Sequence, residues 1–386
     1  MKKVYLDYAA TTPMDARVVK AMTPYFRDKF GNSVSLHSYG QEANIALTKS
    51  REKIARALSA KPEEIIFTGS ATESNNLAIK GVILANKDKG RHVIVSSIEH
   101  HCVLNSAKWL AKQGYRVTYL PVDKTGLVSS AEVKKAIKKD TVLVSIMHAN
   151  TEIGTIQPIE AIGQICRQKK VYFHTDAVQS FGKIPINVEK MKIDLLAASS
   201  HKMCGPKGTA LLYKRQGVRL EPLFHGGGHE SDLRPSTVNV PAIVGFAKAV
   251  EICHKEMTKE QKRLTSLRNK LIKGILKKIP DSHLNGNVKK RLSNNVNIRF
   301  EYVEGEAIIM ELDSYGIAAS TASACSSAKL EPSHVLLAIG LKPQEAHGSL
   351  RFSLGKWTTN KDIDYVLEVL PKVIKKLRKI SPFKKQ

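Results

Sequence analysis

The sequence predicts an α/β fold, in which a large domain with a mostly parallel sheet precedes a smaller α/β domain near the C-terminus. Between residues 65 and 213, short apolar runs rich in β-branched residues alternate with amphipathic stretches. This alternation is typical of βαβ units, whose parallel sheet is covered by helices on both faces. A second, shorter series of strands and helices follows a glycine-rich loop, HGGGHESDLRPST, at 225–237.

Each strand of the large domain is expected where one apolar run lies. The runs are EIIF (64–67), HVIVSS (92–97), RVTYL (116–120), TVLVSIMHAN (141–150), VYFHTDA (171–177), IDLLAAS (193–199) and GTALLY (208–213). Amphipathic stretches between them predict helices at 75–90, 101–114 and 130–140.

The second block begins with a long helical stretch at about 240–279, rich in Lys, Glu and Leu. Beyond it we expect two strands and two helices. The strands are SNNVNIRF (293–300) and GSLRFSLG (348–355), and the helices are VEGEAIIMELDSYG (303–316) and NKDIDYVLEVLPKVIKKL (360–377).

Composition limits the class of protein. The chain has 386 residues, of which 42% are hydrophobic, and a mean hydropathy of -0.22, as expected of a soluble globular protein. No apolar run is long enough to span a bilayer, and the N-terminal segment reaches Asp7 without the apolar core of a signal peptide. We therefore expect a cytoplasmic protein without membrane contact.

The five cysteines give no sign of a disulfide framework. They are dispersed, without a CxxC pair, at Cys102, Cys166, Cys204, Cys253 and Cys325. A structural zinc site is not expected either. The histidines of EHHC (99–102) and of the glycine-rich loop lack a second Cys or His pair that would complete a tetrahedral set. We expect no metal.

The charge is strongly basic, with 61 Lys and Arg against 35 Asp and Glu, a net charge of +26. Contact with RNA, DNA or an acidic protein would explain it, and so would a solvated lysine-rich surface. The sequence has neither RNP-type aromatic interleaving nor a helix-turn-helix signature. We favour the solvated surface and do not expect direct nucleic-acid binding.

Two residues at strand ends predict a cofactor site. Lys202 follows the run at 193–199, where a desolvated amine would be competent to form a Schiff base. Asp176 lies where another apolar run emerges, and a carboxylate there can pair with the pyridinium nitrogen of pyridoxal phosphate. Taken alone, Lys202 could be an ordinary loop lysine, and Asp176 could cap the next helix.

A turn and a histidine extend this predicted site. In FTGSATESNNLAIKG a Gly/Ser/Thr turn precedes a helix that opens near Thr72, where free amides and a hydroxyl would hold a phosphate. The alternative is a simple helix N-cap. His100 follows HVIVSS, where an imidazole can stack on a cofactor ring and transfer protons.

Two further residues have side chains suited to the substrate. Cys325 lies among Ala, Ser and Thr in GIAASTASACSSAKLEPSH, which predicts a thiol on a movable loop. Such a thiol suits a nucleophile. Cys102, Cys166 and Cys253 lie in helical apolar patterns typical of a core. Arg351, inside a strand pattern, would either grip a substrate carboxylate or form a structural ion pair.

Taken together, these segments resemble the cysteine desulfurase family of the NifS/IscS type, within the class V aminotransferases. The resemblance extends from about residue 4 to residue 358. Its motifs, in chain order, are YLDYAATTP, ATESNNLAIKG, IEHHCVL, HANTEIGTIQP, FHTDAVQSFGK, SSHKMCGPKG, GGGHE, SACSSAKLEPS and LRFSLGKWTT.

The resemblance implies a pyridoxal 5'-phosphate enzyme with the fold-type I (aspartate-aminotransferase-like) architecture. It implies a large cofactor-binding domain at 13–260, and a small domain at 1–12 and 261–386 that carries the catalytic-cysteine loop, about 318–332. It also implies a homodimer that converts L-cysteine to L-alanine, leaving a persulfide on Cys325. A sulfur-acceptor protein, either an iron–sulfur scaffold or a tRNA-thiolation enzyme, would take that sulfur.

The resemblance also assigns residues. Cys325, Lys202 and His100 are the predicted catalytic residues, and Arg351, Asn150 and Asn32 the predicted substrate-binding ones. The predicted cofactor-binding residues are Lys202, Asp176, Gln179, Asn150, His100, Ala71, Thr72, Ser199, His201 and, from the other subunit, Thr237.

The chain departs from the family pattern in several places. Gly and Ser are exchanged at Gly69 and Ser70, and if this position needs a positive φ, Ser70 is strained and phosphate binding is weaker. Ser236 replaces a glycine before Thr237. Ala322 replaces another glycine, which would stiffen the loop, and Cys204 replaces a tyrosine.

Other functions remain open on the sequence alone. A lyase that prefers selenocysteine, or an aminotransferase, could share this fold, and its products would distinguish it. A basic scaffold that binds RNA or an acidic partner is the alternative outside enzymes.

Overall fold

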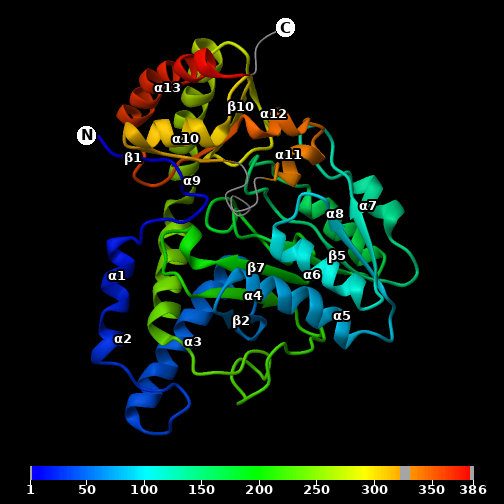
Figure 1. Ribbon diagram of the computed structural model, residues 1–386. Coiled ribbons are helices and arrows are strands. Elements are labelled where there is room, and N and C mark those ends of the chain that lie inside the picture. Colours follow the sequence, from blue (N-terminus) through cyan, green and yellow to red (C-terminus); the bar gives the residue numbers. More distant parts are fainter. Residues whose placement is uncertain (1, 322–330, 383–386) are drawn as a thin grey trace.

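The computed structural model describes residues 2–321 and 331–382. A seven-stranded sheet lies at the centre of the large domain, with helices on both of its faces (Figure 1). Its strand order is β2-β8-β7-β6-β5-β3-β4, and only β8 runs against the other six. The strands are β2 (Ile65–Thr68), β3 (His92–Ser96), β4 (Arg116–Leu120), β5 (Thr141–Ser145), β6 (Tyr172–Asp176), β7 (Leu195–Ser199) and β8 (Ala210–Lys214).

Every apolar run predicted as a strand of the large domain overlaps one of these strands. All residues of β2, β3, β5 and β7 are buried, which explains why their sequences are continuously apolar instead of alternating. The edge strand β4 is partly exposed. The predicted mostly parallel sheet is therefore confirmed.

Helices of the large domain cover both faces of this sheet. The helix predicted to open near Thr72 begins at Ala71, and the stretch at 75–90 contains a π-helical segment between α4 and α5. The helices are α1 (Ala16–Met22), α2 (Pro24–Arg27), α3 (Ser38–Leu58), α4 (Ala71–Asn76), the π-helical segment (Leu77–Gly81), α5 (Val82–Ala85), α6 (His101–Lys112), α7 (Ser130–Ala136) and α8 (Ile159–Gln168).

The long helix α9 (Val240–Lys278) joins the two domains, as Figure 1 shows. Its first half contributes Ile243 and Phe246 to the hydrophobic core beneath the central sheet. Its second half contributes Leu267 and Leu271 to a separate core in the small domain. The boundaries at 12/13 and 260/261 stay a prediction.

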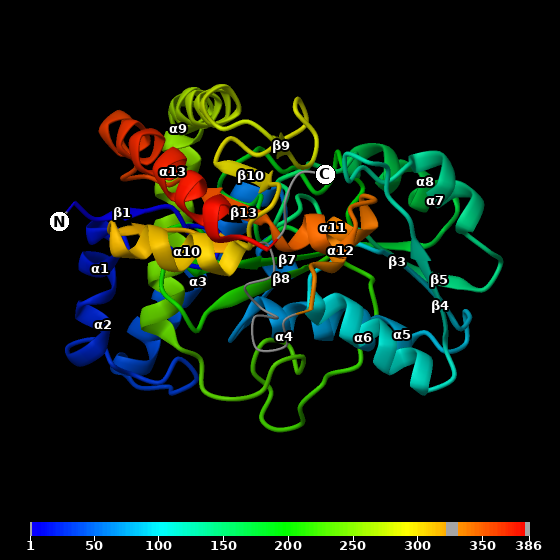
Figure 2. The same cartoon turned by 45° about the horizontal axis from the view of Figure 1, so that its top comes forward.

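The small domain is a four-stranded antiparallel sheet covered by helices (Figure 2). The strands and helices predicted at 293–300, 303–316, 348–355 and 360–377 are present. The strands are β9 (Ser282–Leu284), β10 (Asn295–Phe300), β12 (Ser320–Thr321) and β13 (Ser349–Ser353), and β1 (Val4–Tyr5) pairs in parallel with β11 (Ile317–Ala318). The helices are α10 (Gly305–Ser314), α11 (His334–Ala338), α12 (Pro343–His347) and α13 (Asn360–Ile380). Cys325 and Ala322 lie outside the described residues.

Within the described residues, no helix has the length and apolar character needed to cross a membrane.

Candidate active site

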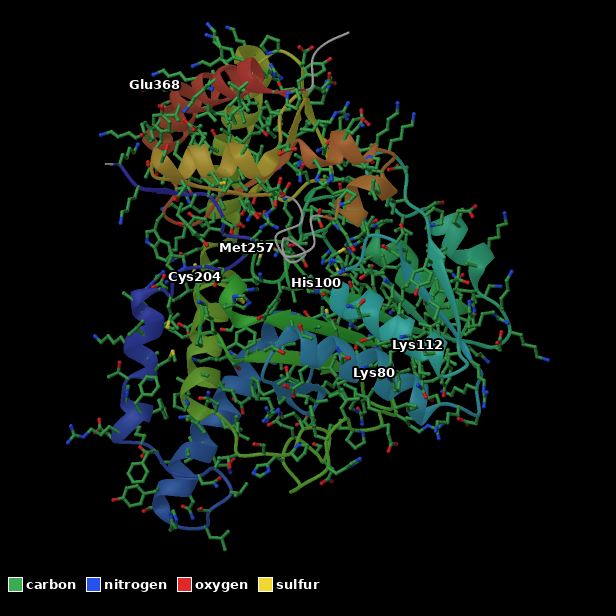
Figure 3. All side chains as sticks on the ribbon, viewed as in Figure 1. Lys80, His100, Lys112, Cys204, Met257 and Glu368 are labelled. Carbon is green, nitrogen blue, oxygen red and sulfur yellow. The ribbon has the colours of Figure 1, made fainter. Side chains whose placement is uncertain are left out.

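A cleft of about 560 Å³ opens where the carboxyl ends of the parallel strands meet the small domain. Segments that follow β2, β3, β5, β6 and β7 line its large-domain side, while α11 and β13 line the other. Parallel α/β sheets bind ligands at this edge because the loops there converge on one crevice. His100 lies here, between the central sheet and the small domain (Figure 3).

Lys202 is held at the floor of this cleft by the N-terminal segment. It ends a short 3-10 turn after β7, and its Nζ donates to the backbone oxygens of Ala9 and Ala10 at 2.7 and 2.6 Å. The side chain of Thr12 donates to His201 O at 2.7 Å and accepts from Cys204 N at 2.8 Å. The N-terminal segment therefore fixes the lysine loop from both sides.

Asp176 ends β6 with its carboxylate facing the cleft. Its Oδ1 accepts from Val178 N at 2.9 Å, and its Oδ2 accepts from Asn75 Nδ2 at 2.8 Å. The next segment is a turn, so the alternative of an Asp capping a helix is not what the structure shows. Two donors thus satisfy this buried carboxylate, as a buried polar group requires.

His100 is a neutral imidazole near pH 7. Burial lowers its pKa, although Asp176 acts in the opposite direction. Its Nδ1 accepts from Cys102 N at 3.2 Å, which caps α6 and fixes the ring. A fixed neutral imidazole can accept or donate a proton inside the cleft.

The predicted phosphate turn surrounds the start of α4. Gly69, Ser70, Ala71 and Thr72 all line the cleft. Ser70 has φ -161 and ψ 158, so its backbone is extended and unstrained, and its side chain caps the helix by accepting from Glu73 N. The expectation of strain at Ser70 was wrong, because this position does not need a positive φ.

Three groups from the β7–β8 connection face the same cleft: Ser199, His201 and Lys207. Burial, and then the neighbouring lysines, lower the pKa of His201 to about 4, so its ring is neutral and one ring nitrogen can donate. These side chains, with Thr72, form a donor set suited to a phosphate.

Arg351 brings a cation from β13 to the opposite wall. Its guanidinium forms an ion pair with Asp7 at 2.8 Å and donates to Thr151 O at 3.3 Å. Its Nε is buried without a hydrogen-bond partner among the described residues. The structural ion pair considered for Arg351 is therefore present, and a donor is still left for a carboxylate.

Comparison with known proteins agrees with this arrangement. A family model described as aminotransferase class-V matches residues 4–366. The chain is 52% identical over 385 residues to a cysteine desulfurase IscS from Dictyoglomus turgidum, with 100% of this chain and 98% of the relative covered. The chain belongs to the cysteine desulfurase group of the class-V aminotransferases. It is also 53% identical over 381 residues to the cysteine desulfurase IscS of Methanosarcina thermophila, covering 99% of this chain and 94% of that one.

Solved structures agree with the family. A "NifS-like protein" superposes with a TM-score of 0.92 at 40% identity, covering 97% of this chain and 100% of that chain. A structure titled "SspA in complex with cysteine" has a TM-score of 0.82 at 40% identity, covering 92% and 100%. Both predictions are confirmed: the family that the motifs indicated, and the fold-type I architecture.

Not every residue implied by the family resemblance reaches the cleft of this chain. Gln179 does, and its Nε2 donates to Ala9 O at 3.0 Å. Asn150 is fully buried and does not line the cleft, because its side-chain amide holds the turn after β5. Asn32 and Thr237 are exposed and lie outside the cleft of their own chain.

Residue-by-residue reasoning missed several groups at the site. Asn75 orients the Asp176 carboxylate, and Asp7 pairs with Arg351. Glu152 and His334 line the cleft as well. Asp7, Asn75 and Glu152 lie in the motifs YLDYAATTP, ATESNN and HANTE, so the density of polar residues in these motifs was the available signal.

One departure from the family pattern does strain the backbone. Ser236 has φ 107, in the region that favours glycine. Among the described residues, no group of three or more His, Cys, Asp or Glu could hold a metal ion.

Proposed function

We propose that this protein converts L-cysteine to L-alanine and transfers the sulfur to Cys325 as a persulfide, with pyridoxal 5'-phosphate as its cofactor. The sulfur would supply iron–sulfur cluster assembly or tRNA thiolation. The observation that carries the proposal is the convergence of Lys202, Asp176, His100 and Arg351 on one cleft, in a chain of this family.

The residues of the cleft fit the cofactor. A primary amine at Lys202 and a carboxylate at Asp176 match the aldehyde and the pyridine nitrogen, and the turn at 69–72 with Ser199 and His201 matches the phosphate. The volume suits a cofactor together with a small substrate. When bound, pyridoxal 5'-phosphate acts as an electron sink that weakens the bonds at the substrate's α-carbon.

The protein's own groups would then orient the substrate and hold its protons. Arg351 would bind the substrate carboxylate through the side of its guanidinium that carries the unpartnered Nε. Lys202 and His100 would share the proton transfers, since one offers an amine and the other a neutral imidazole. Asn150 would act by shaping the turn that presents Thr151 and Glu152.

The four described cysteines support Cys325 as the sulfur acceptor. Burial raises the pKa of the Cys102 and Cys253 thiols to about 12, and it also raises the pKa of Cys166 and Cys204. All four are therefore protonated near neutral pH, whereas attack on sulfur needs a thiolate. Cys325 lies outside the described residues, and it is the thiol that the family resemblance assigns as the sulfur acceptor.

The working enzyme would be a homodimer in the cytoplasm, with the predicted domains at 13–260 and at 1–12 plus 261–386. Asn32 and Thr237 are exposed in the single chain, where a second subunit could use them. A sulfur-acceptor protein would bind near the mouth of the cleft.

The visible absorbance spectrum of the purified protein tests the cofactor, and product analysis with L-cysteine tests the reaction. We expect a yellow protein whose absorbance band is lost on borohydride treatment, and alanine and sulfane sulfur in equal amounts. A keto acid instead of alanine would indicate an aminotransferase. Faster turnover of selenocysteine would indicate the selenium-preferring lyase. A colourless protein that stays inert with added pyridoxal phosphate would contradict the proposal.

A further inference from the structure

Glu152 is a buried acid in the wall of the cleft. It belongs to the turn after β5, has 6% of its surface exposed, and lines the cleft. Asn150 Oδ1 accepts from its backbone N at 2.9 Å, and its backbone oxygen accepts from Asn295 Nδ2 of β10 at 2.9 Å. Groups from both domains thus fix the backbone of Glu152, which restricts the position of its carboxylate.

The small domain contributes a hydrogen bond to this carboxylate. Ser333 Oγ donates to Glu152 Oε2 at 2.5 Å, while the same oxygen caps α11 by accepting from Val335 N and Leu336 N, both at 3.2 Å. Because those two bonds occupy the serine's lone pairs, its single proton is directed at Glu152. Oε2 must therefore accept, and any proton that Glu152 carries resides on Oε1.

Arg351 is a cation that acts electrostatically on the Glu152 carboxyl, and it already forms an ion pair with another carboxylate. It attracts Glu152, and its guanidinium pairs with Asp7 at 2.8 Å. Burial raises the pKa of Glu152 to about 7, although Ser333 and Arg351 act in the opposite direction. Arg351 thus forms an ion pair with Asp7 and binds the backbone oxygen of Thr151, next to Glu152, and the Glu152 carboxyl lines the same cleft.

Two histidines that flank this wall, His148 and His334, are neutral at pH 7. Burial lowers the pKa of His148, which precedes the turn, to about 4. Burial also lowers the pKa of His334, which follows Ser333 on α11. The contacts from β10 are uncharged amides. Among the charged side chains of the cleft, Arg351 is the one that lowers the pKa of Glu152, so a substrate bound at Arg351 can act on Glu152.

We propose that Glu152 is a positioning residue that takes up one proton from solvent when the substrate carboxylate binds at Arg351. The proposal rests on the role of Arg351 given above. A substrate carboxylate at Arg351 would add a negative charge to a cleft wall that already holds the carboxyls of Asp7 and Glu152, and like charges repel strongly where solvent screening is weak. Protonating Glu152 on Oε1 removes this repulsion and leaves the bond from Ser333 intact.

The sign of the pH effect follows. Below its pKa, Glu152 is already neutral and the substrate carboxylate meets no opposing charge. Above its pKa, binding must draw a proton from an increasingly alkaline solution, so KM for L-cysteine rises with pH. For one coupled proton the rise approaches about tenfold per pH unit.

The test compares wild type with Glu152→Gln in the cofactor-loaded enzyme between pH 6 and pH 8.5. Gln keeps the size of the side chain and can accept from Ser333, but it cannot titrate. The ionisation of cysteine and of the cofactor changes KM with pH in both enzymes alike. These shared effects therefore cancel in the ratio of wild-type KM to variant KM. We expect this ratio to rise through pH 7 while the kcat ratio stays constant. A ratio that does not change with pH would overturn the proposal.

A second measurement uses wild type alone and does not depend on the variant folding. 3-Mercaptopropionate has the carboxylate and thiol but no amine, so its inhibition constant reports the carboxylate site. We expect that constant to rise through pH 7, and that of the uncharged 3-mercaptopropionamide to stay constant. The same pH dependence for both compounds would contradict the proposal.

Two further variants separate a proton site from a purely structural role. Ser333→Gly preserves most of the helix cap but removes the bond that stabilises the charged carboxylate. The Ser333→Gly variant should shift the midpoint of the pH dependence of KM to higher pH. Loss of packing alone would not cause such a shift. Arg351→Lys tests the underlying assignment. An unchanged KM in Arg351→Lys would refute the role of Arg351 in binding the substrate carboxylate. If Arg351→Lys raises KM but the ratio of wild-type KM to Glu152→Gln KM does not change with pH, only the role of Glu152 is refuted.

Discussion

The two walls of the cleft are built in different ways. On the large-domain wall, Asp176 ends a buried parallel strand, Lys202 and His100 follow two others, and backbone groups bind all three side chains. On the small-domain wall, Arg351 pairs with Asp7 of the same domain, while Arg351 and Ser333 also bind Thr151 and Glu152 of the large domain. The first wall is built on strand ends of the sheet, with Ala9 and Ala10 also binding Lys202, whereas the second is held by ion pairs and side-chain hydrogen bonds.

This difference separates chemistry from substrate positioning. Groups fixed by strands keep their place whatever binds, which suits attachment of a cofactor and proton transfer. Groups fixed by exchangeable ion pairs can change partners when a carboxylate enters. We therefore expect substitutions on the first wall to abolish turnover, and substitutions on the second mainly to change KM.

The largest effect is expected for Lys202→Ala. Loss of the amine should remove the visible absorbance band and lower kcat by at least about 10³-fold, since both attachment and proton transfer are lost. Lys183→Met is the matched control. Burial lowers the pKa of Lys183 to about 8, so it also resembles a reactive amine, but it does not line the cleft. If Lys183→Met lost the visible absorbance band, the assignment of Lys202 as the lysine that binds the cofactor would be wrong.

Asp176→Asn should reduce kcat by roughly 10²-fold while the fold survives. The amide oxygen can still accept from Val178 N, and the unpartnered Asn75 Oδ1 can accept from the new amide. The charge alone is lost, which weakens the electron sink. Steady-state kinetics with saturating cofactor measures this effect, and full activity would show that Asp176 is only structural.

Arg351→Lys should raise KM for L-cysteine by about 10-fold or more and change kcat less. A lysine keeps the charge but loses the planar, two-pronged grip on a carboxylate. Asp7→Asn should have the opposite effect, a lower KM, because it removes a competing partner of Arg351. If Arg351→Lys altered kcat alone, the division between the two walls would be wrong.

The smallest effect concerns two serines that replace family glycines. Ser236→Gly should raise the free energy of unfolding by about 1 kcal/mol, because φ 107 disfavours a side chain. Ser70→Gly should lower it by a few tenths of a kcal/mol, since Ser70 is an unstrained N-cap. Urea denaturation measures both, and changes of the same sign would contradict this account.

Sequence reasoning recovered the large-domain wall better than the other. Each strand was visible as an apolar run, and a polar residue at or shortly after its carboxyl end marked the cleft, as at Asp176 and Lys202. It could not find the pairing of Arg351 with Asp7, or of Glu152 with Ser333, because those contacts join residues 344 and 181 positions apart. The backbone angle at Ser70 was likewise not encoded by the motif alone.

The most direct test of the account is to find where the sulfur goes. The cofactor-loaded enzyme is mixed with L-cysteine in the absence of a sulfur-acceptor protein and then digested. The masses of its cysteine-containing peptides are measured by mass spectrometry under non-reducing conditions. We predict one extra sulfur atom on the peptide that contains Cys325, none on the peptides of the other four cysteines, and one alanine per sulfur. Extra sulfur on Cys204, or alanine formed by Cys325→Ala at the wild-type rate, would contradict the account.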